Sequence, residues 1–244
     1  MLVNETQSCY NRTEVIPVPK FLSGNVLKIL AAIFMTIDHI GVMLFPRVEI
    51  LRIVGRLALP IYAFMIAEGC KYTRNKKKYF GMVFGLGAVC QTVYYFFDGS
   101  LYFSILITFS LSILMIYALQ YWKRKKTVLS GLVLASSVIG VYLLNQVFTI
   151  DYGFWGCMLP VFAALAHGTE QDSDTVNITM LGIGLVFLGI SIGQTQWPSL
   201  LALPLLYAYN GKRGRLKMKY FFYIFYPTHL VVLEGIAMLM QHFK

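Results

Sequence analysis

The chain has 244 residues, of which 57% are hydrophobic and only 13% are charged, and its mean hydropathy is +0.64. Soluble domains carry about twice this share of charged residues. No polar stretch here is long enough to form such a domain, so the composition indicates a polytopic membrane protein. The formal net charge of +10 would favour nucleic-acid binding in a soluble chain, but most of the 21 basic residues lie in three short runs between apolar segments. That placement indicates membrane topology instead.

The apolar segments predict an all-α bundle of about nine membrane spans. They lie at residues 26–45, 52–70, 79–97, 101–121, 128–147, 152–167, 178–193, 197–210 and 220–241. A full crossing needs about 20 residues, so the sixth, seventh and eighth spans are short. The eighth also carries Pro198 and Pro204 and is predicted to be tilted, broken or only partly crossing.

The three basic runs, at residues 71–78, 123–126 and 212–219, fall on one side of the membrane if the nine spans alternate. The positive-inside rule places that side in the cytoplasm, which predicts a multi-pass protein of the inner (cytoplasmic) membrane. The N-terminus is then cytoplasmic and the C-terminus lies outside. Residues 1–25 are predicted to be a flexible arm, and residues 26–244 a single transmembrane domain.

Ionisable residues within membrane spans are energetically unfavourable and are by default candidates for a functional site. In this chain they are Asp38, His39, Arg56, Glu68, Asp151, His229 and Glu234. The predicted topology collects a set of polar residues at one outer level, namely Asp38, His39, Arg52, Arg56, Gln91, Tyr94, Asp151 and Tyr152. His229 lies near the middle of the last span, and Glu68 lies towards the cytoplasmic end.

The short loop at residues 46–51 makes a tight hairpin of the first two spans, which brings Asp38 and His39 near Arg52 and Arg56. Consecutive residues on a helix point about 100° apart. Asp38 is therefore expected to pair with an arginine, while His39 faces a cavity.

Structural roles compete with these functional ones. An Asp–Arg pair can simply hold two helices together, and His39 and His229 can both be packing residues. Glu68 can balance the charge of the basic run, and Glu234 can lie at the outer boundary. Asp151 is expected to be the N-cap of the sixth span.

A histidine is the usual general base near neutral pH. His39 is expected to take a proton from an amine or hydroxyl that attacks an activated acyl group, with an arginine or tyrosine stabilising the oxyanion. The chain shows no serine nucleophile elbow, Walker loop, HExxH or GxGxxG motif. Its four cysteines lack metal-site or redox spacing, so no metal is expected.

The basic run at residues 71–78 has a second possible role. The phosphates of an anionic carrier such as coenzyme A would dock on cytoplasmic lysine and arginine side chains. Arg74, Lys76, Lys77 and Lys78 lie at the inner mouth of the second and third spans. Membrane topology and attraction to anionic lipids explain the same residues, so both interpretations stand.

Five segments together resemble the TraX family in sequence and in order. They are LKILAAIFMTIDHIGVMLFP, LRIVGRLALPIYAFMIAEGCKYTRNKKKY, DYGFWGCMLP, LPLLYAYNGKRG and KYFFYIFYPTHL, and they cover most of residues 26–235. That family is named for a conjugation protein that acetylates the N-terminus of the F-type pilin subunit. It is also similar to the wider group of multi-span acyltransferases that use coenzyme A carriers.

The resemblance implies a catalytic histidine early in the chain, and His39 matches it. Arg56 matches the arginine of the family's GRLA-type segment, and Glu68 matches the glutamate of its AEG segment. The triplet that begins at Asp151, and His229, match later motifs. The resemblance also implies acetyl-coenzyme A as the acyl donor.

The sequence thus predicts an integral-membrane acetyltransferase acting on a protein N-terminus such as that of a pilin-like protein, an envelope glycan or a lipid head group. The predicted catalytic residues are His39, Asp38, Arg56, Asp151 and His229. The predicted carrier-binding residues are Glu68, Arg74, Lys76, Lys77 and Lys78. The predicted substrate-binding residues are Arg52, Tyr152, Gln91 and Tyr94. Two other hypotheses remain, a proton-coupled transporter and a membrane scaffold, and membrane lipids are the only other expected partners.

Overall fold

A computed structural model describes residues 19–99, 102–215 and 219–242, apart from the side chains of 94, 97, 98, 219–223, 241 and 242. These residues form helices and no sheet, which confirms the all-α prediction. The helices, in chain order, are α1 (Gly24–Met43), α2 (Glu49–Gly55), α3 (Ala58–Tyr72), α4 (Lys76–Asp98), α5 (Ile105–Lys125), α6 (Val128–Val147), α7 (Gly153–Ala163), α8 (Asp174–Ile192), the 3-10 helix η1 (Gln194–Ala202), α9 (Leu203–Tyr207) and α10 (Lys219–His242).

Five helical segments of the described chain are long and apolar enough to cross a membrane. They are residues 24–43, 49–72 (α2 with α3), 105–125, 128–147 and 174–192. The chain is therefore a multi-pass membrane protein. The other four predicted spans correspond to α4, α7, the η1–α9 pair and α10.

The number of crossings stays a prediction, because some of these elements are short. Helix α7 has 11 residues, or about 16 Å at 1.5 Å per residue, against a hydrocarbon core of about 30 Å. The predicted break in the eighth span is confirmed, since η1 contains Pro198 and gives way to the five-residue α9, which begins with Leu203 and Pro204.

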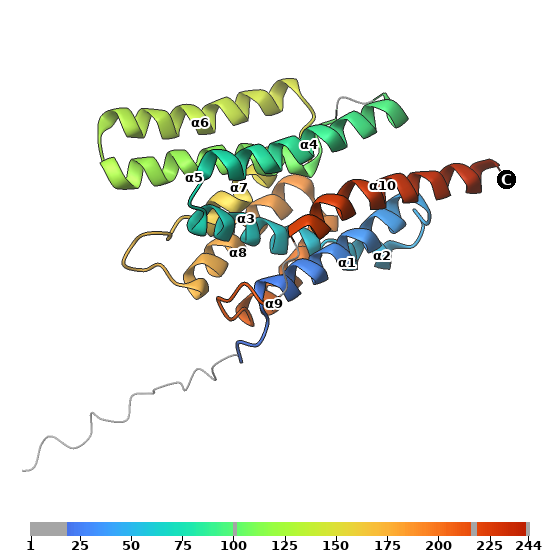
Figure 1. Cartoon of the computed structure of the whole chain (residues 1–244), viewed down its shortest axis with the longest axis horizontal. Coiled ribbons are helices and arrows are strands. Elements are labelled where there is room, and N and C mark those ends of the chain that lie inside the picture. Colours follow the sequence, from blue (N-terminus) through green and yellow to red (C-terminus); the bar gives the residue numbers. More distant parts are fainter. Residues whose placement is uncertain (1–18, 100–101, 216–218, 243–244) are drawn as a thin grey trace, which may run out of the picture.

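The described residues of the basic runs lie at one end of the bundle, as the alternating topology requires. Figure 1 shows the α5–α6 turn and the loop after α7 at the left end, and the C-terminus at the right end. Backbone bonds at the left end join Gly24 N to Lys212 O at 2.8 Å, and an ion pair joins Lys71 Nζ to Asp172 Oδ1 at 2.9 Å. Which compartment this end faces is still a prediction.

Four helices that start at this basic end, α1, α4, α6 and α8, begin with polar caps. Ser23, Asn75, Thr127 and Ser173 each accept a bond from a backbone N–H in the first turn of α1, α4, α6 and α8. Such caps satisfy donors that would otherwise be unpaired where the chain enters an apolar medium. They explain where these spans begin.

The end of the predicted N-terminal arm is fixed to the bundle. Leu22 forms an isolated parallel bridge with Tyr209, and its N–H donates to Ala208 O at 2.9 Å. Helix α1 then begins at Gly24, two residues before the predicted span. Residues 1–18 of the arm lie outside the described residues.

Candidate active site

The hairpin of α1 and α2 forms the first part of the site. Arg52 Nη1 of α2 donates to Asp38 Oδ2 of α1 at 2.8 Å, and the two side chains are 30% and 13% exposed. The expected Asp–Arg pair is present, and Arg52 is the arginine that forms the hydrogen-bonded ion pair. Gly55 permits the contact, because a Cβ there would lie 2.3 Å from Asp38 Cβ.

Arg56 serves a different partner because the helix breaks beside it. Helix α2 ends at Gly55 and α3 starts at Ala58. Arg56 Nη1 donates to Tyr152 Oη at 2.9 Å, and its guanidinium carbon lies 5.7 Å from the centre of that ring. A residue 96 positions later in the chain is thus joined to the α1–α2 hairpin.

Tyr152 occupies an unusual backbone conformation. Its φ is +59°, and Gly153 follows with φ +60°. A non-glycine residue in the left-handed region costs about 1–2 kcal/mol, and such strain concentrates at functional sites. A Cβ on Gly156 would lie 2.4 Å from Tyr152 Cβ, so two glycines make room for this turn.

Asp151 precedes this turn and accepts a bond from Tyr102. Tyr102 Oη donates to Asp151 Oδ1 at 2.5 Å, and Asp151 N donates to Phe103 O at 2.9 Å. The expected N-cap role is wrong, because Tyr152 occupies the N-cap position and no side chain caps α7.

Two histidines from opposite ends of the sequence meet between α1 and α10. His39 Nδ1 and His229 Nε2 are 2.8 Å apart. His229 also lies against two rings of its own helix, Phe225 at 5.3 Å between centroids and Tyr226 at 5.4 Å. Its Nδ1 lies 3.1 Å from Phe225 O.

A cavity of about 70 Å³ lies where these elements converge, which is several times the roughly 10–15 Å³ that one water molecule needs. Its polar lining comes from α1, α3, α10, the segment before α5 and the loop before α7. It consists of Asp38, His39, Tyr62, Tyr102, Ser104, Asp151, Tyr152 and Tyr226. The expectation that His39 faces a cavity is confirmed in geometry.

Comparison with known proteins identifies the family of the chain. The model of the family described as TraX protein matches residues 23–237. The chain belongs to the TraX family. A relative named "Probable fimbrial assembly protein FimC, serogroup H1", from Dichelobacter nodosus, is 28% identical over 236 residues, which is 88% of this chain and 96% of the relative.

A shorter match joins this TraX-family chain to an uncharacterised protein of Rickettsia prowazekii. The two are 55% identical over 40 residues, which is 16% of each chain. No solved structure matches. The family assignment therefore rests on sequence over most of the chain.

Of the other predicted substrate-binding residues, Gln91 contacts a residue that lines the cavity. Gln91 Oε1 accepts a bond from Ser104 N at 3.3 Å, so α4 supports one wall of the cavity. The side chain of Tyr94 lies outside the described residues. Roles in substrate binding for Arg52, Tyr152 and Gln91 stay predictions.

The predicted carrier-binding residues do not form one group. Arg74, Lys77 and Lys78 are exposed at the basic end. Lys76 Nζ donates to Gln120 Oε1 and lies 4.8 Å above the centre of the Tyr117 ring. Glu68, by contrast, is only 4% exposed and belongs to a different cluster.

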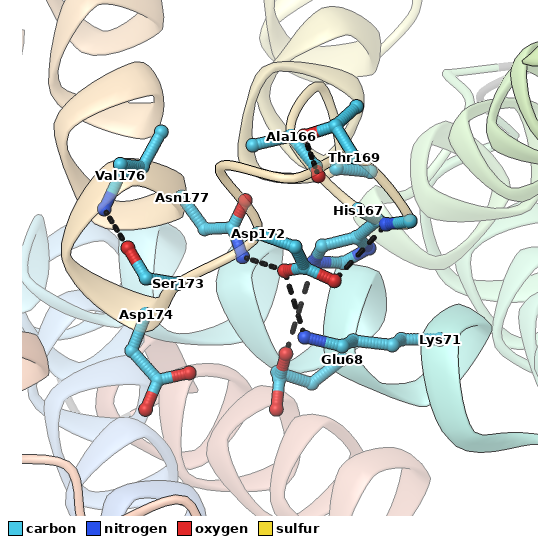
Figure 2. A network of polar contacts seen from close by, with 12 residues as sticks. Glu68, Lys71, Ala166, His167, Thr169, Asp172, Ser173, Asp174, Val176 and Asn177 are labelled. Carbon is cyan, nitrogen blue, oxygen red and sulfur yellow. Dashed lines mark hydrogen bonds and ion pairs between the residues drawn. The ribbon is translucent and has the colours of Figure 1, made fainter.

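Figure 2 shows that cluster, in which α3 meets the loop before α8. Glu68 Oε1 lies 3.8 Å from His167 Nε2, and both side chains are buried. Asp172 accepts bonds from Lys71 and Gly168 N at 2.9 and 3.0 Å. Burial raises the pKa of Asp172, but the Gly168 and Lys71 bonds outweigh it and hold the pKa at about 2.

Sequence reasoning missed His167, Asp172 and Tyr102. His167 closes an apolar segment, where a single imidazole gives no signal of its partner. The acidic loop at 168–177 was visible in the sequence, but nothing indicated that Asp172 returns to α3. Tyr102 was one of 16 tyrosines.

Proposed function

We propose that the protein is a membrane acyltransferase that transfers acetyl from acetyl-coenzyme A to an amine or hydroxyl. One observation carries the proposal: His39 lines a small cavity together with two aspartates, Asp38 and Asp151, and with Tyr152 from a separate segment. A base, an oxyanion donor and a cavity that receives the reacting groups are the minimum set for acyl transfer between two bound substrates.

His39 acts as the general base in this proposal. It takes a proton from the attacking amine or hydroxyl as the new bond to the acetyl carbonyl carbon forms. The carbon–sulfur bond of the thioester then breaks, and the departing thiolate takes the proton from His39. The products are the acetylated acceptor and free coenzyme A, and His39 returns to its starting state.

Tyr152 is the proposed oxyanion donor. Its Oη accepts the bond from Arg56 Nη1, so its own proton remains available to donate into the cavity. The positive guanidinium polarises the hydroxyl and strengthens that donation. Removal of one oxyanion donor typically lowers kcat about 10²- to 10³-fold.

The donor would enter from the basic end of the bundle. His39 lies about 22 Å along α1 from Gly24, at 1.5 Å per residue. The nucleotide phosphates would stay with Arg74, Lys77 and Lys78, which are exposed there. Only the flexible acyl end would reach the cavity. Glu68 is left out of this docking surface because it is buried.

The acceptor follows from the relative, whose printed name connects it with fimbrial assembly. We propose a pilin-like protein as the first acceptor to test, with the amine of its N-terminus as the nucleophile. An envelope glycan or a lipid head group would offer a hydroxyl or amine to the same base.

A proton-coupled transporter is less favoured by the arrangement along α3. Leu59 lines the cavity, and Glu68 belongs to the cluster at the other end. Ile61, Phe64 and Met65, on the same face of α3 as Glu68, are apolar and buried. A proton path along this face of α3 would need polar groups at those positions.

The test combines binding and transfer with purified protein in detergent. Calorimetry measures acetyl-coenzyme A and coenzyme A, and labelled acetyl is followed into a pilin N-terminal peptide, a glycan extract and lipid vesicles. We expect His39→Gln to bind the carrier but to transfer about 10²- to 10⁴-fold more slowly. His167→Gln removes a buried imidazole outside the cavity and should keep transfer. Wild-type protein that neither binds the carrier nor labels any acceptor would contradict the proposal.

A further inference from the structure

We infer that His229 is a positioning residue, which holds the proton of His39 on Nδ1 and leaves Nε2 of His39 as the reactive atom. The chemical consequence rests on the proposed function, but the tautomer itself does not. The inference follows from three contacts that form one chain, from Phe225 O through His229 to His39 and the cavity.

The tautomer of His229 is set by the main chain. Phe225 O lies 3.1 Å from His229 Nδ1, and a carbonyl oxygen only accepts hydrogen bonds. The proton of neutral His229 is therefore on Nδ1. Its Nε2 must then carry a lone pair, because a neutral imidazole has one donor nitrogen and one acceptor nitrogen.

The tautomer of His39 follows from that of His229. His229 Nε2 accepts, so His39 Nδ1, at 2.8 Å, must donate. The ring geometry agrees with an N–H···N bond in the plane of both rings. The ring planes are 13° apart, and the centroids are 5.0 Å apart although the two nitrogens nearly touch. Two rings stacked face to face would have their centroids closer together for the same distance of 2.8 Å between the nitrogens.

The lone pair of His39 is consequently on Nε2. Among the described residues, no group forms a hydrogen bond with that atom, and His39 lines the cavity. The neighbouring carboxylate does not bind Nδ1, because Asp38 Oδ2 accepts from Arg52 and Asp38 Oδ1 forms no hydrogen bond with the described residues. Nε2 of His39 is therefore the atom that takes the proton of the acceptor. His39 is already in the tautomer that catalysis requires before any substrate binds.

A neutral partner also limits where an added proton can reside. Protonated His39 would still donate from Nδ1 to His229 and would hold the second proton on Nε2, facing the cavity. Transfer of the Nδ1 proton along this bond would move the positive charge to His229 but would leave the Nε2 proton of His39 in place. In either form an N–H of His39 faces the cavity, which is the position from which the thiolate of the departing carrier can take the proton.

The packing around His229 makes this arrangement rigid. The ring lies nearly parallel to that of Phe225 and at 76° to that of Tyr226. His229 is 7% exposed, and Tyr226 is 8% exposed. A side chain packed against two aromatic rings cannot rotate to present Nδ1 to His39 without displacing them.

The decisive experiment is nuclear magnetic resonance of the full chain in detergent, labelled with ¹⁵N in the histidine rings. The chain has only four histidines, and single His→Gln variants assign them. Ring nitrogen shifts report which nitrogen carries the proton. We expect His39 and His229 both to carry it on Nδ1. A proton on Nε2 of His39 would overturn the inference, whatever the activity.

Two variants at position 229 separate positioning from packing. His229→Phe keeps an aromatic ring but removes the acceptor, and we expect His39 to become a mixture of tautomers while kcat falls about 10²-fold or more with KM unchanged. His229→Gln offers a carbonyl oxygen as acceptor and should recover part of kcat. Equal kcat in the two variants would show that the ring alone matters and would also overturn the inference.

The two proposals fail separately in these experiments. If the tautomers are as inferred but wild-type protein transfers no acetyl, then the proposed function is wrong and the histidine pair stands. If wild-type protein transfers acetyl while His39 carries its proton on Nε2, then the function stands and His229 does not position the base. Wild-type spectra decide the tautomer even if a variant fails to fold.

Discussion

Gly55→Ala tests whether the close approach of α1 and α2 builds the site. The added Cβ would lie 2.3 Å from Asp38 Cβ and 2.6 Å from Asp38 Cα. An ordinary contact is about 3.4–4 Å, so the two helices must separate by about 1 Å. The neighbour in the way includes backbone, which no side-chain rotation can clear. Overpacking of this kind costs about 1–3 kcal/mol, and a 1 Å misplacement of reacting groups lowers rates about 10²-fold.

Gly85→Ala is the matched control. It makes the same chemical change within helix α4, where nothing lies within 4 Å of the new Cβ. An alanine there should be neutral or stabilising by about 0.4–1 kcal/mol. Unfolding in detergent, followed by circular dichroism, gives the stability, and the acetyl-transfer assay gives the rate. If Gly55→Ala matches Gly85→Ala in both, the proposed dependence of the site on this contact is wrong.

Three further predictions concern single groups. Tyr152→Phe should keep the fold and lower kcat about 10²- to 10³-fold; unchanged kcat in steady-state assays would remove Tyr152 as oxyanion donor. Replacing Asp38 by Leu together with Arg52 by Met should unfold at a higher denaturant concentration than either single variant, because each single change leaves a charge unpaired; simple additivity would contradict this. Asp172 has its pKa lowered from about 3.9 to about 2, so its stabilisation is present above about pH 4 and is lost as the pH falls towards 2. Thermal unfolding of wild type should therefore approach that of Asp172→Asn over this window, and parallel curves would refute the assignment.

The span pattern was predictable because apolar length is a local property of the sequence. The described helices follow the predicted segments closely, and the prolines at 198 and 204 correctly indicated a broken element. The short α7 was overestimated. Residues 164–167 are apolar enough to extend a predicted span, but the helix ends at Ala163, where Lys123 Nζ donates to the carbonyl oxygens of Ala164, Leu165 and His167.

The sequence indicated which residues belong to the site, but it did not indicate which of them contact each other. His39 and His229 both stood out as ionisable groups in apolar segments, yet 190 positions separate them, and no pattern in one sequence joins them. Arg52 and Arg56 are one turn apart, so the hairpin alone did not decide which would meet Asp38. The break after Gly55 decided it, because it directs Arg56 to Tyr152.

The two polar clusters lie at opposite ends of α3, and this constrains any route for the acyl group. Leu59 borders the cavity and Glu68 borders the basic end, about 14 Å apart at 1.5 Å per residue. Ile61 and Phe64, on the same face of α3 as Glu68, are apolar and fully buried, so this face offers no route for a charged carrier. Under the proposed function, the phosphates remain with the lysines in water, and only the uncharged thioester arm reaches the cavity, by a path other than this buried face. The basic end would then select the donor, and the cavity would select the acceptor.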